Sequence, residues 1–111
     1  MVQNVPESDW TRFRDLRELA LERLCKQVLE QVELLVRNTS SSYHERYLDL
    51  WRLLNERDRE VARAFDDPRR SRMIDQLAAI HAHGLLETGE LATFTPSTRA
   101  AVEALAKAFA R

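Results

Sequence analysis

One uninterrupted amphipathic stretch, from Ser42 to Asp67, most constrains what this chain can fold into. Ser42 and Glu45 have the spacing of a capping box, in which the serine hydroxyl accepts from a helical N–H and the glutamate reaches back to the cap. At about 100° per residue, most large apolar side chains of the stretch fall on one face: Tyr43, Tyr47, Leu50, Trp51, Leu54, Val61 and Phe65. The stretch therefore predicts one long helix whose apolar face packs on a core or on a partner.

Composition predicts helices for the rest of the chain as well. The 111 residues include only two Gly and three Pro, which favours helices over a sheet with its many turns. A chain of this length forms one domain and buries one modest core. We therefore expect an all-α fold in a single domain that spans residues 1–111.

Turn and cap signals divide this domain into segments. Residues 38–42 form a polar turn, and the pairs Asp67-Pro68 and Thr95-Pro96 each place a capping residue before a proline. Gly84 is suited to end a helix in a left-handed conformation. We expect a frayed N-terminus over 1–8, a cap within the pair Ser8-Asp9, and helices over 9–37, 42–66, 68–83, 88–94 and 96–110. The last helix is rich in alanine, so we expect it to pack at the periphery.

The two longest segments are expected to pair with each other. The turn that joins 9–37 to 42–66 is short, and short connections place consecutive helices side by side and antiparallel. The expected fold is a long antiparallel helical hairpin, with a shorter third helix packed on it and a small C-terminal helical segment.

This hairpin carries more apolar surface than one small core can cover. Four leucines lie outside the main apolar stripe of the first helix: Leu16, Leu19, Leu29 and Leu34. Either a later helix of the same chain covers them, or they face a partner. We favour the partner and predict that two chains join through their hairpins into a dimeric helix bundle. The candidate contacts are Tyr47, Trp51 and Leu54 on the second helix, or Leu16 and Leu19 on the first.

Two charged residues interrupt the apolar faces of the hairpin. Arg17 lies in the centre of the first stripe and Asp58 near the centre of the second. A buried charge is costly unless it is paired. Folding the hairpin about residue 40 leaves the two about 7 Å apart along the helix axis. We therefore hypothesise an Arg17–Asp58 ion pair, within or between chains. The alternative is that Arg17 packs its stem and turns its guanidinium outward.

Four arginines gather around the expected start of the third helix: Arg63, Arg69, Arg70 and Arg72. Arginine side chains around a helix N-terminus can bind an anion such as a phosphate, a carboxylate or a nucleic-acid backbone. The neighbouring Asp66 and Asp67 favour a simpler interpretation, in which acids and arginines neutralise one another at this corner. With a net charge of −1, no overall field draws the chain to nucleic acid.

No residue pattern predicts catalysis, a metal site or a cofactor. His81 and His83 point to different sides of a helix, so they cannot share an ion, and His44 could meet His81 only if the second and third helices pack closely. The single Cys25 excludes an internal disulfide and fits a reducing compartment. No stretch resembles a membrane span or a signal peptide, so we expect a cytoplasmic protein without membrane contact.

No motif identifies an activity, and an enzyme is disfavoured. The function that the sequence supports best is a small cytosolic interaction or scaffold protein that acts as a homodimer and is open to a further protein partner. The alternative is an anion- or nucleic-acid-binding regulatory module that uses the arginine cluster, with nucleic acid as the less favoured ligand.

Overall fold

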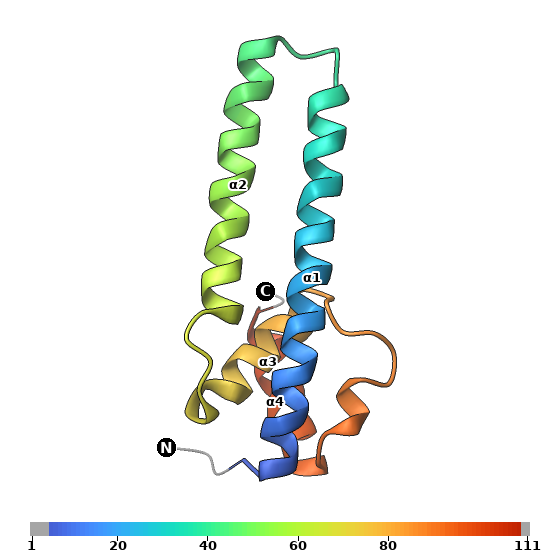
Figure 1. The fold of residues 1–111 in the computed structure, drawn as a ribbon, viewed down its shortest axis with the longest axis vertical. Coiled ribbons are helices and arrows are strands. Elements are labelled where there is room, and N and C mark those ends of the chain that lie inside the picture. The colour runs from blue at the N-terminus through green and yellow to red at the C-terminus, as the bar shows by residue number, and fades with distance from the viewer. Residues whose placement is uncertain (1–4, 110–111) are drawn as a thin grey trace.

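The computed structural model describes residues 5–109, which contain helices and no strand. The α-helices are α1 (Glu7–Arg37), α2 (Tyr43–Phe65), α3 (Met73–Ala82) and α4 (Pro96–Phe109), and the 3-10 helices are η1 (Arg70–Arg72) and η2 (Leu91–Thr93). The predicted all-α class is therefore confirmed. α1 and α2 lie side by side and run in opposite directions, while α3 and α4 pack together near their lower ends (Figure 1). The predicted helix end at 110 and the first part of the predicted segment 1–8 lie outside the described residues.

The molecule measures 52 × 26 × 24 Å and has two parts. We call residues 25–63 the arm, which consists of the far part of α1, the turn and most of α2 (Figure 1). The remaining described residues form the base. Every buried side chain belongs to the base, and between 25 and 63 no side chain is buried. The hydrophobic core therefore occupies one end of the molecule.

The core of the base combines one face of α1 with the end of α2, α3 and α4. Its largest apolar members are fully buried: Phe13, Leu24, Phe65, Met73, Leu77, Ile80, Leu85 and Val102. α4 is not peripheral as predicted, because Val102 is 0% exposed and α4 packs along α3. Leu16 is 5% exposed and joins this core. It is therefore covered within its own chain and does not offer the predicted dimer contact.

The start of α1 differs from the prediction because Asp9 does not cap its own helix. Pro6 is the capping residue, and its carbonyl oxygen accepts from the backbone N–H groups of Asp9 and Trp10 at 3.1 Å. Asp9 is 2% exposed and turns instead toward the start of α4. Its carboxylate accepts from Thr95 N at 3.0 Å, from Thr95 Oγ1 at 2.6 Å and from Thr98 Oγ1 at 2.7 Å. Asp9 thus ties the first turn of α1 to the first turn of α4.

The start of α2 has the capping box predicted from its sequence. Glu45 N donates to Ser42 Oγ at 3.1 Å, and Ser42 N donates to Glu45 Oε1 at 2.9 Å. The hydrogen bonds from the Ser42 backbone and side chain lower the pKa of Glu45 below its ordinary value. The turn and the following helix are therefore defined by local chemistry.

The third helix begins later than predicted, because Asp67 does not cap it. Asp67 has a φ of 48°, in the left-handed region, and its carboxylate pairs with arginines. The chain then forms η1, and α3 starts only at Met73. Gln76 of α3 donates to the carbonyl oxygen of Asp66 at 2.7 Å. This bond satisfies a free carbonyl at the end of α2.

The predicted stop at Gly84 is present. Gly84 has a φ of 69°, its N–H donates to His81 O at 3.0 Å, and Leu85 N donates to Ile80 O at 3.2 Å. These are the bonds of a Schellman motif. The predicted helix over 88–94 is reduced to η2, because Gly89 also has a positive φ of 89° and the segment is tied to α1.

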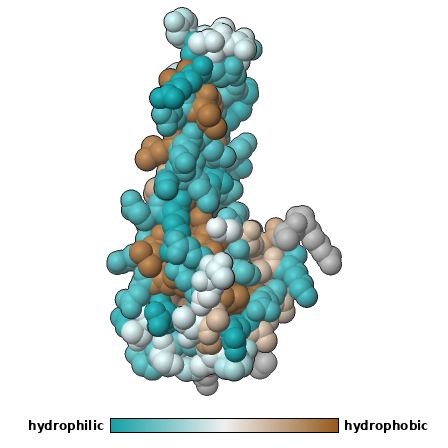
Figure 2. Space-filling view, turned by 90° about the vertical axis from the view of Figure 1, so that its right-hand side faces the viewer, coloured by the Kyte–Doolittle hydropathy of each residue, from teal (hydrophilic) through white to brown (hydrophobic). Residues whose placement is uncertain are grey.

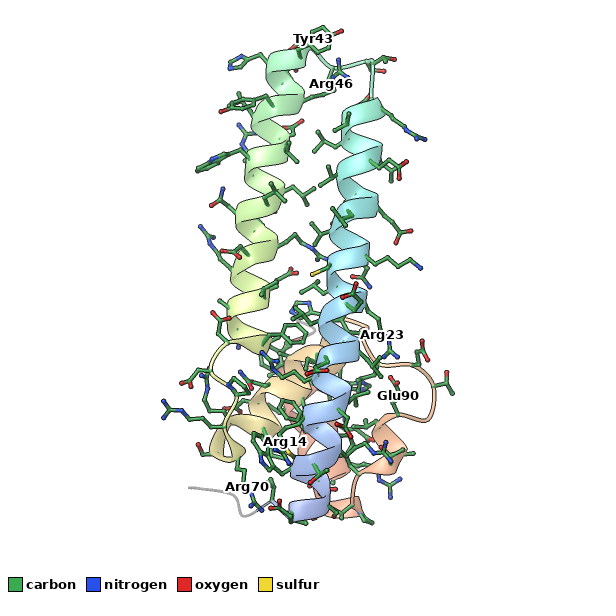
Figure 3. The ribbon with its side chains drawn as sticks, in the orientation of Figure 1. Arg14, Arg23, Tyr43, Arg46, Arg70 and Glu90 are labelled. Atoms are coloured by element: carbon green, nitrogen blue, oxygen red, sulfur yellow. The ribbon has the colours of Figure 1, made fainter. Side chains whose placement is uncertain are left out.

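The tie between this segment and α1 is a bidentate ion pair. Arg23 donates from Nη1 and Nη2 to the two carboxylate oxygens of Glu90 at 2.6 and 2.9 Å (Figure 3). Arg23 also donates to the Leu85 carbonyl oxygen at 2.9 Å. The hydrogen bonds from Arg23 lower the pKa of Glu90, and those to Glu90 raise the pKa of Arg23. The connection between α3 and α4 is therefore held against the side of α1.

Candidate interaction surface on the arm

The arm displays large apolar side chains that the rest of residues 5–109 leaves uncovered. Leu29 is 67% exposed on α1, and on α2 Tyr47, Trp51 and Leu54 are 65%, 62% and 46% exposed. Single exposed leucines are common, but a cluster of large apolar and aromatic side chains marks an interaction site. Figure 2 shows hydrophobic atoms that interrupt the polar surface along the arm.

These side chains gather on one face of the arm. At the centre of this face is a groove between α1 and α2, whose lining includes Cys25, Val28, Leu29, Leu54, Asp58 and Val61. Toward the tip, Val36 continues the α1 side of the groove, and Tyr47 and Trp51 continue the α2 side, at helical spacings. We call this surface the apolar arm face and define it by its exposed members: Cys25, Leu29, Val36, Tyr47, Trp51, Leu54 and Asp58.

Polar side chains also tie α1 to α2 along the arm, and one of them, Arg57, lines the groove itself. Arg57 donates from Nη2 to Gln27 Oε1 at 3.1 Å. Near the tip, Arg46 donates to the Val36 carbonyl oxygen at 2.7 Å, and its guanidinium lies 4.6 Å from the centre of the Tyr43 ring (Figure 3). Polar contacts thus join α1 to α2, while the apolar arm face presents its apolar side chains outward.

The base leaves the apolar arm face open. α1 enters the core of the base through Phe13, Leu16 and Ala20. At about 100° per residue, these three lie on the opposite side of α1 from Cys25 and Leu29. In Figure 2 the base extends to one side of the molecule, and hydrophobic atoms of the arm project at the other edge. A partner can therefore approach this face along the full length of the arm.

The remaining candidate contact, Leu19, stands apart from this face. It is 53% exposed, but it lies on the base and on a different side of α1 from Leu29. Leu34 is 72% exposed and also lies away from the apolar arm face. The three predicted residues of α2 are thus brought together on one surface, and the two of α1 are not.

The proposed ion pair between Arg17 and Asp58 is not formed within one chain. Arg17 donates from Nη2 to the backbone carbonyl of Phe65, and its guanidinium lies 5.9 Å from the Phe65 ring centre. The carbonyl groups in the last turn of a helix lack intrahelical partners and attract a positive charge, which explains this choice. Asp58 is exposed on the apolar arm face.

The predicted arginine cluster does not converge on one anion site. Arg69 and Arg72 both pair with the Asp67 carboxylate, at 3.0 and 3.4 Å. Arg63 turns away from them, and its guanidinium lies 4.2 Å from the centre of the Phe109 ring. Three of the four arginines thus have partners of their own, since Arg69 and Arg72 pair with Asp67 and Arg63 contacts an aromatic ring.

The fourth arginine, Arg70, binds Glu7 at the start of α1 and Val5 just before it. Its Nη1 lies 2.6 Å from Glu7 Oε2, and its Nη2 donates to the Val5 carbonyl oxygen at 2.8 Å. Figure 3 shows Arg70 at the foot of the base. Because Arg69 and Arg72 share the Asp67 carboxylate while Arg63 and Arg70 face other partners, the four arginines form no common anion pocket.

The titratable residues offer no metal cluster among positions 5–109, where no three His, Cys, Asp or Glu side chains come close enough to hold an ion. His44 is exposed near the tip, His81 and His83 are half-buried on the base, and Cys25 is an exposed free thiol. In the same range, no helix combines the length and the apolar character that crossing a membrane requires.

No protein-family model, no curated protein and no solved structure matches this chain. The apolar arm face is therefore interpreted from its own chemistry and geometry.

Proposed function

We propose that this protein is a homodimeric interaction module in which the apolar arm faces of two chains pack together as a four-helix bundle. The observation that carries the proposal is the absence of any buried side chain between 25 and 63, combined with the exposure of Leu29, Tyr47 and Trp51. Two helices alone cannot bury apolar side chains from water on both sides. A second pair of helices completes such a core.

The exposed aromatic side chains supply the anchors that such an interface needs. Tyr47 and Trp51 together expose about 250 Å², taking 150–250 Å² for each aromatic side chain and their exposed fractions of 65% and 62%. A stable interface buries about 800 Å² per partner, and its energy concentrates in buried aromatic residues near its centre. Leu29 and Leu54 enlarge the same surface.

The charge of the arm favours an apolar partner over a polyanion. Residues 25–63 contain seven acidic and seven basic side chains, so the arm is neutral at pH 7. A neutral surface has no long-range attraction for nucleic acid. A second copy of the same face matches it in both apolar character and charge.

The proposed module acts in the cytoplasm, where a reducing environment keeps the exposed thiol of Cys25 free. Joining the arms leaves both bases unoccupied, so each can hold a further protein. A dimer of this kind serves as a small scaffold.

The test is the molar mass in solution. Size-exclusion chromatography with light scattering should give twice the chain mass of 13.0 kDa for the wild type. A variant with Trp51→Glu and Leu54→Glu should elute as a monomer, because each change places a charge on the apolar arm face. Leu19→Glu with Leu34→Glu is the matched control, since it adds the same two charges to exposed leucines outside this face. A wild type that stays monomeric at high micromolar concentration overturns the proposal.

A further inference from the structure

Building on the proposed dimer, we infer that its two arms pack antiparallel and that the Tyr47 hydroxyl of each chain donates a hydrogen bond to Asp58 of the partner subunit. In this arrangement the two-fold axis runs across the arms, so α1 packs against α1 of the second copy and α2 against α2. The alternative axis runs along the helices, pairs α1 with α2, and places the two tips together. Asp58 distinguishes the two arrangements, because its carboxylate needs a donor once the face is covered.

The apolar arm face has the spacing of a coiled-coil seam on both helices. Its members on α2 are alternately three and four residues apart, and so are those on α1 once the half-buried Val32 is included. At about 100° per residue, each set covers an arc of about 60°. The members are Cys25, Leu29, Val32 and Val36 on α1, and Tyr47, Trp51, Leu54 and Asp58 on α2. Each helix therefore presents a narrow seam that suits one facing helix.

Two hydrogen bonds between α1 and α2 fix which seam members share a level along the arm. Arg57 donates to Gln27, and Arg46 donates to the carbonyl oxygen of Val36. Both helices rise by about 1.5 Å per residue in opposite directions, so the other levels follow by counting, to within about one residue. The members that share a level are Val36 with Tyr47, Val32 with Trp51, Leu29 with Leu54, and Cys25 with Asp58.

One position of an axis across the arms aligns the seams of both helices at once. On α1 the axis lies midway between Leu29 and Val32, and on α2 the same level falls midway between Trp51 and Leu54. Every seam member then faces a seam member of the second copy, and symmetry forms each contact twice. The facing pairs are Leu29 with the partner's Val32, Cys25 with the partner's Val36, Trp51 with the partner's Leu54, and Tyr47 with the partner's Asp58.

The length of the arm fits this arrangement. The turn over residues 38–42 forms the tip, at the end of the molecule away from the base (Figure 1). Counting from the axis places the tip of the second copy level with Leu21, about 6 Å beyond Cys25 at about 1.5 Å per residue. The second arm thus covers the apolar arm face from end to end and stops beside the upper edge of the base.

Tyr47 and Asp58 each supply the partner that the other lacks in a single chain. Within residues 5–109, neither side chain forms a hydrogen bond or a salt bridge with another residue. Both are exposed, so water satisfies them in one chain. A buried carboxylate without a donor is costly, whereas a hydrogen bond from a hydroxyl to a carboxylate is short and strong. The antiparallel dimer forms this bond twice.

The parallel arrangement leaves the same carboxylate without a good donor. There each level of α1 faces the same level of the second copy's α2, so Asp58 meets the partner's Cys25, whose thiol is a weak donor. Lys26 is the cation on α1 at this level, but it projects about 90° away from the seam at about 100° per residue. A buried charge that lacks a counterpart destabilises an interface. Asp58 therefore favours the antiparallel arrangement.

A distance measurement tests the arrangement. Cys25→Ser removes the only cysteine, and Ser8→Cys adds a labelling site at the exposed start of α1. Pulsed electron resonance between two spin labels should give about 70 Å, because Ser8 lies far from the axis at about 1.5 Å per residue. A parallel dimer would bring the labels within about 40 Å, since helices in a bundle lie about 8–10 Å apart.

Removal of one hydroxyl tests the pair itself, with dissociation constants from analytical ultracentrifugation. Tyr47→Phe should weaken the dimer at least about tenfold, because two buried carboxylates per dimer then lack their donor. Tyr47→Phe with Asp58→Leu should bind at least as tightly as the wild type, because apolar groups then replace both partners. Tyr43→Phe is the matched control. It removes the same hydroxyl from a tyrosine that does not face the partner's Asp58, and it should change the affinity by less than about threefold.

The outcomes separate this inference from the proposed function on which it rests. A wild type that stays monomeric overturns the dimer and the antiparallel packing together. A wild-type dimer whose labels lie within about 40 Å overturns the antiparallel packing alone and leaves the homodimer standing. So does a dimer in which Tyr47→Phe changes the affinity no more than Tyr43→Phe. A separation near about 70 Å, with a weakened Tyr47→Phe dimer, is the expected result.

Discussion

The buried carboxylate of Asp9 provides the strongest test of how the base is held together. Its side chain accepts three hydrogen bonds from the first turn of α4 and is 2% exposed. Hydrogen bonds to a charged group contribute about 1.5–3 kcal/mol each, but removing them together is not additive. We expect Asp9→Asn to lower the free energy of unfolding by about 2 kcal/mol, because one acceptor oxygen remains.

Asp9→Ala should cost more, about 3–4 kcal/mol, because it leaves the hydroxyl groups of Thr95 and Thr98 and one backbone N–H without their acceptor. This is a large part of the roughly 5–15 kcal/mol that stabilises a typical domain. Urea denaturation followed by circular dichroism at fixed chain concentration measures the difference. Asp15→Asn, an exposed acid on the same helix, is the control and should change stability by less than about 0.5 kcal/mol.

The pH dependence of this contribution has a defined sign. Burial alone raises the pKa of Asp9, but hydrogen bonds from Thr95 and Thr98 outweigh it, so the pKa lies below its ordinary value of 3.8. Folding therefore favours the ionised form. The stability that Asp9 contributes is complete above the ordinary value and is lost as the pH falls through the lower value of the folded protein. The difference in the free energy of unfolding between wild type and Asp9→Asn should thus become smaller at acidic pH. Equal stability at pH 7, or a gap that widens on acidification, would refute the reasoning.

Two further predictions concern the connection between α3 and α4. Gly84→Ala should lower the free energy of unfolding by about 1 kcal/mol, because φ is 69° at this position. The added methyl group meets nothing within 4 Å, so the cost comes from the backbone conformation alone. An unchanged melting temperature would contradict this prediction. Glu90→Gln should cost about 1 kcal/mol, because the Arg23 pair is partly exposed, and should speed amide hydrogen exchange across residues 86–93 at pH 7. Because the folded protein lowers the pKa of Glu90, the difference in the free energy of unfolding between wild type and Glu90→Gln should shrink as the pH falls below the ordinary value of 4.5. Amide exchange that is equally fast across the base in both proteins would contradict the role of the Arg23–Glu90 pair.

The sequence by itself determined the helices and the stops whose chemistry is local. The capping box of Ser42 and Glu45 and the Schellman motif at Gly84 join residues only a few positions apart, so their spacing carries the information. The amphipathic pattern of α2 likewise predicted an apolar face that packs on a core or on a partner. Where a local signal competed with a distant partner, as at Asp9 with Thr95, the predicted cap was wrong.

Only the tertiary structure decided which side chains meet across the chain. Asp9 and Thr95 are 86 positions apart and Arg23 and Glu90 are 67 apart, and no local pattern marks either pair. Leu16 and Leu29 show the same limit, because both are leucines of α1 outside its main stripe, yet one is 5% and the other 67% exposed. The reason is that the base reaches only the first part of α1, and where that cover stops is set by the packing of α3 and α4, not by the residues of α1.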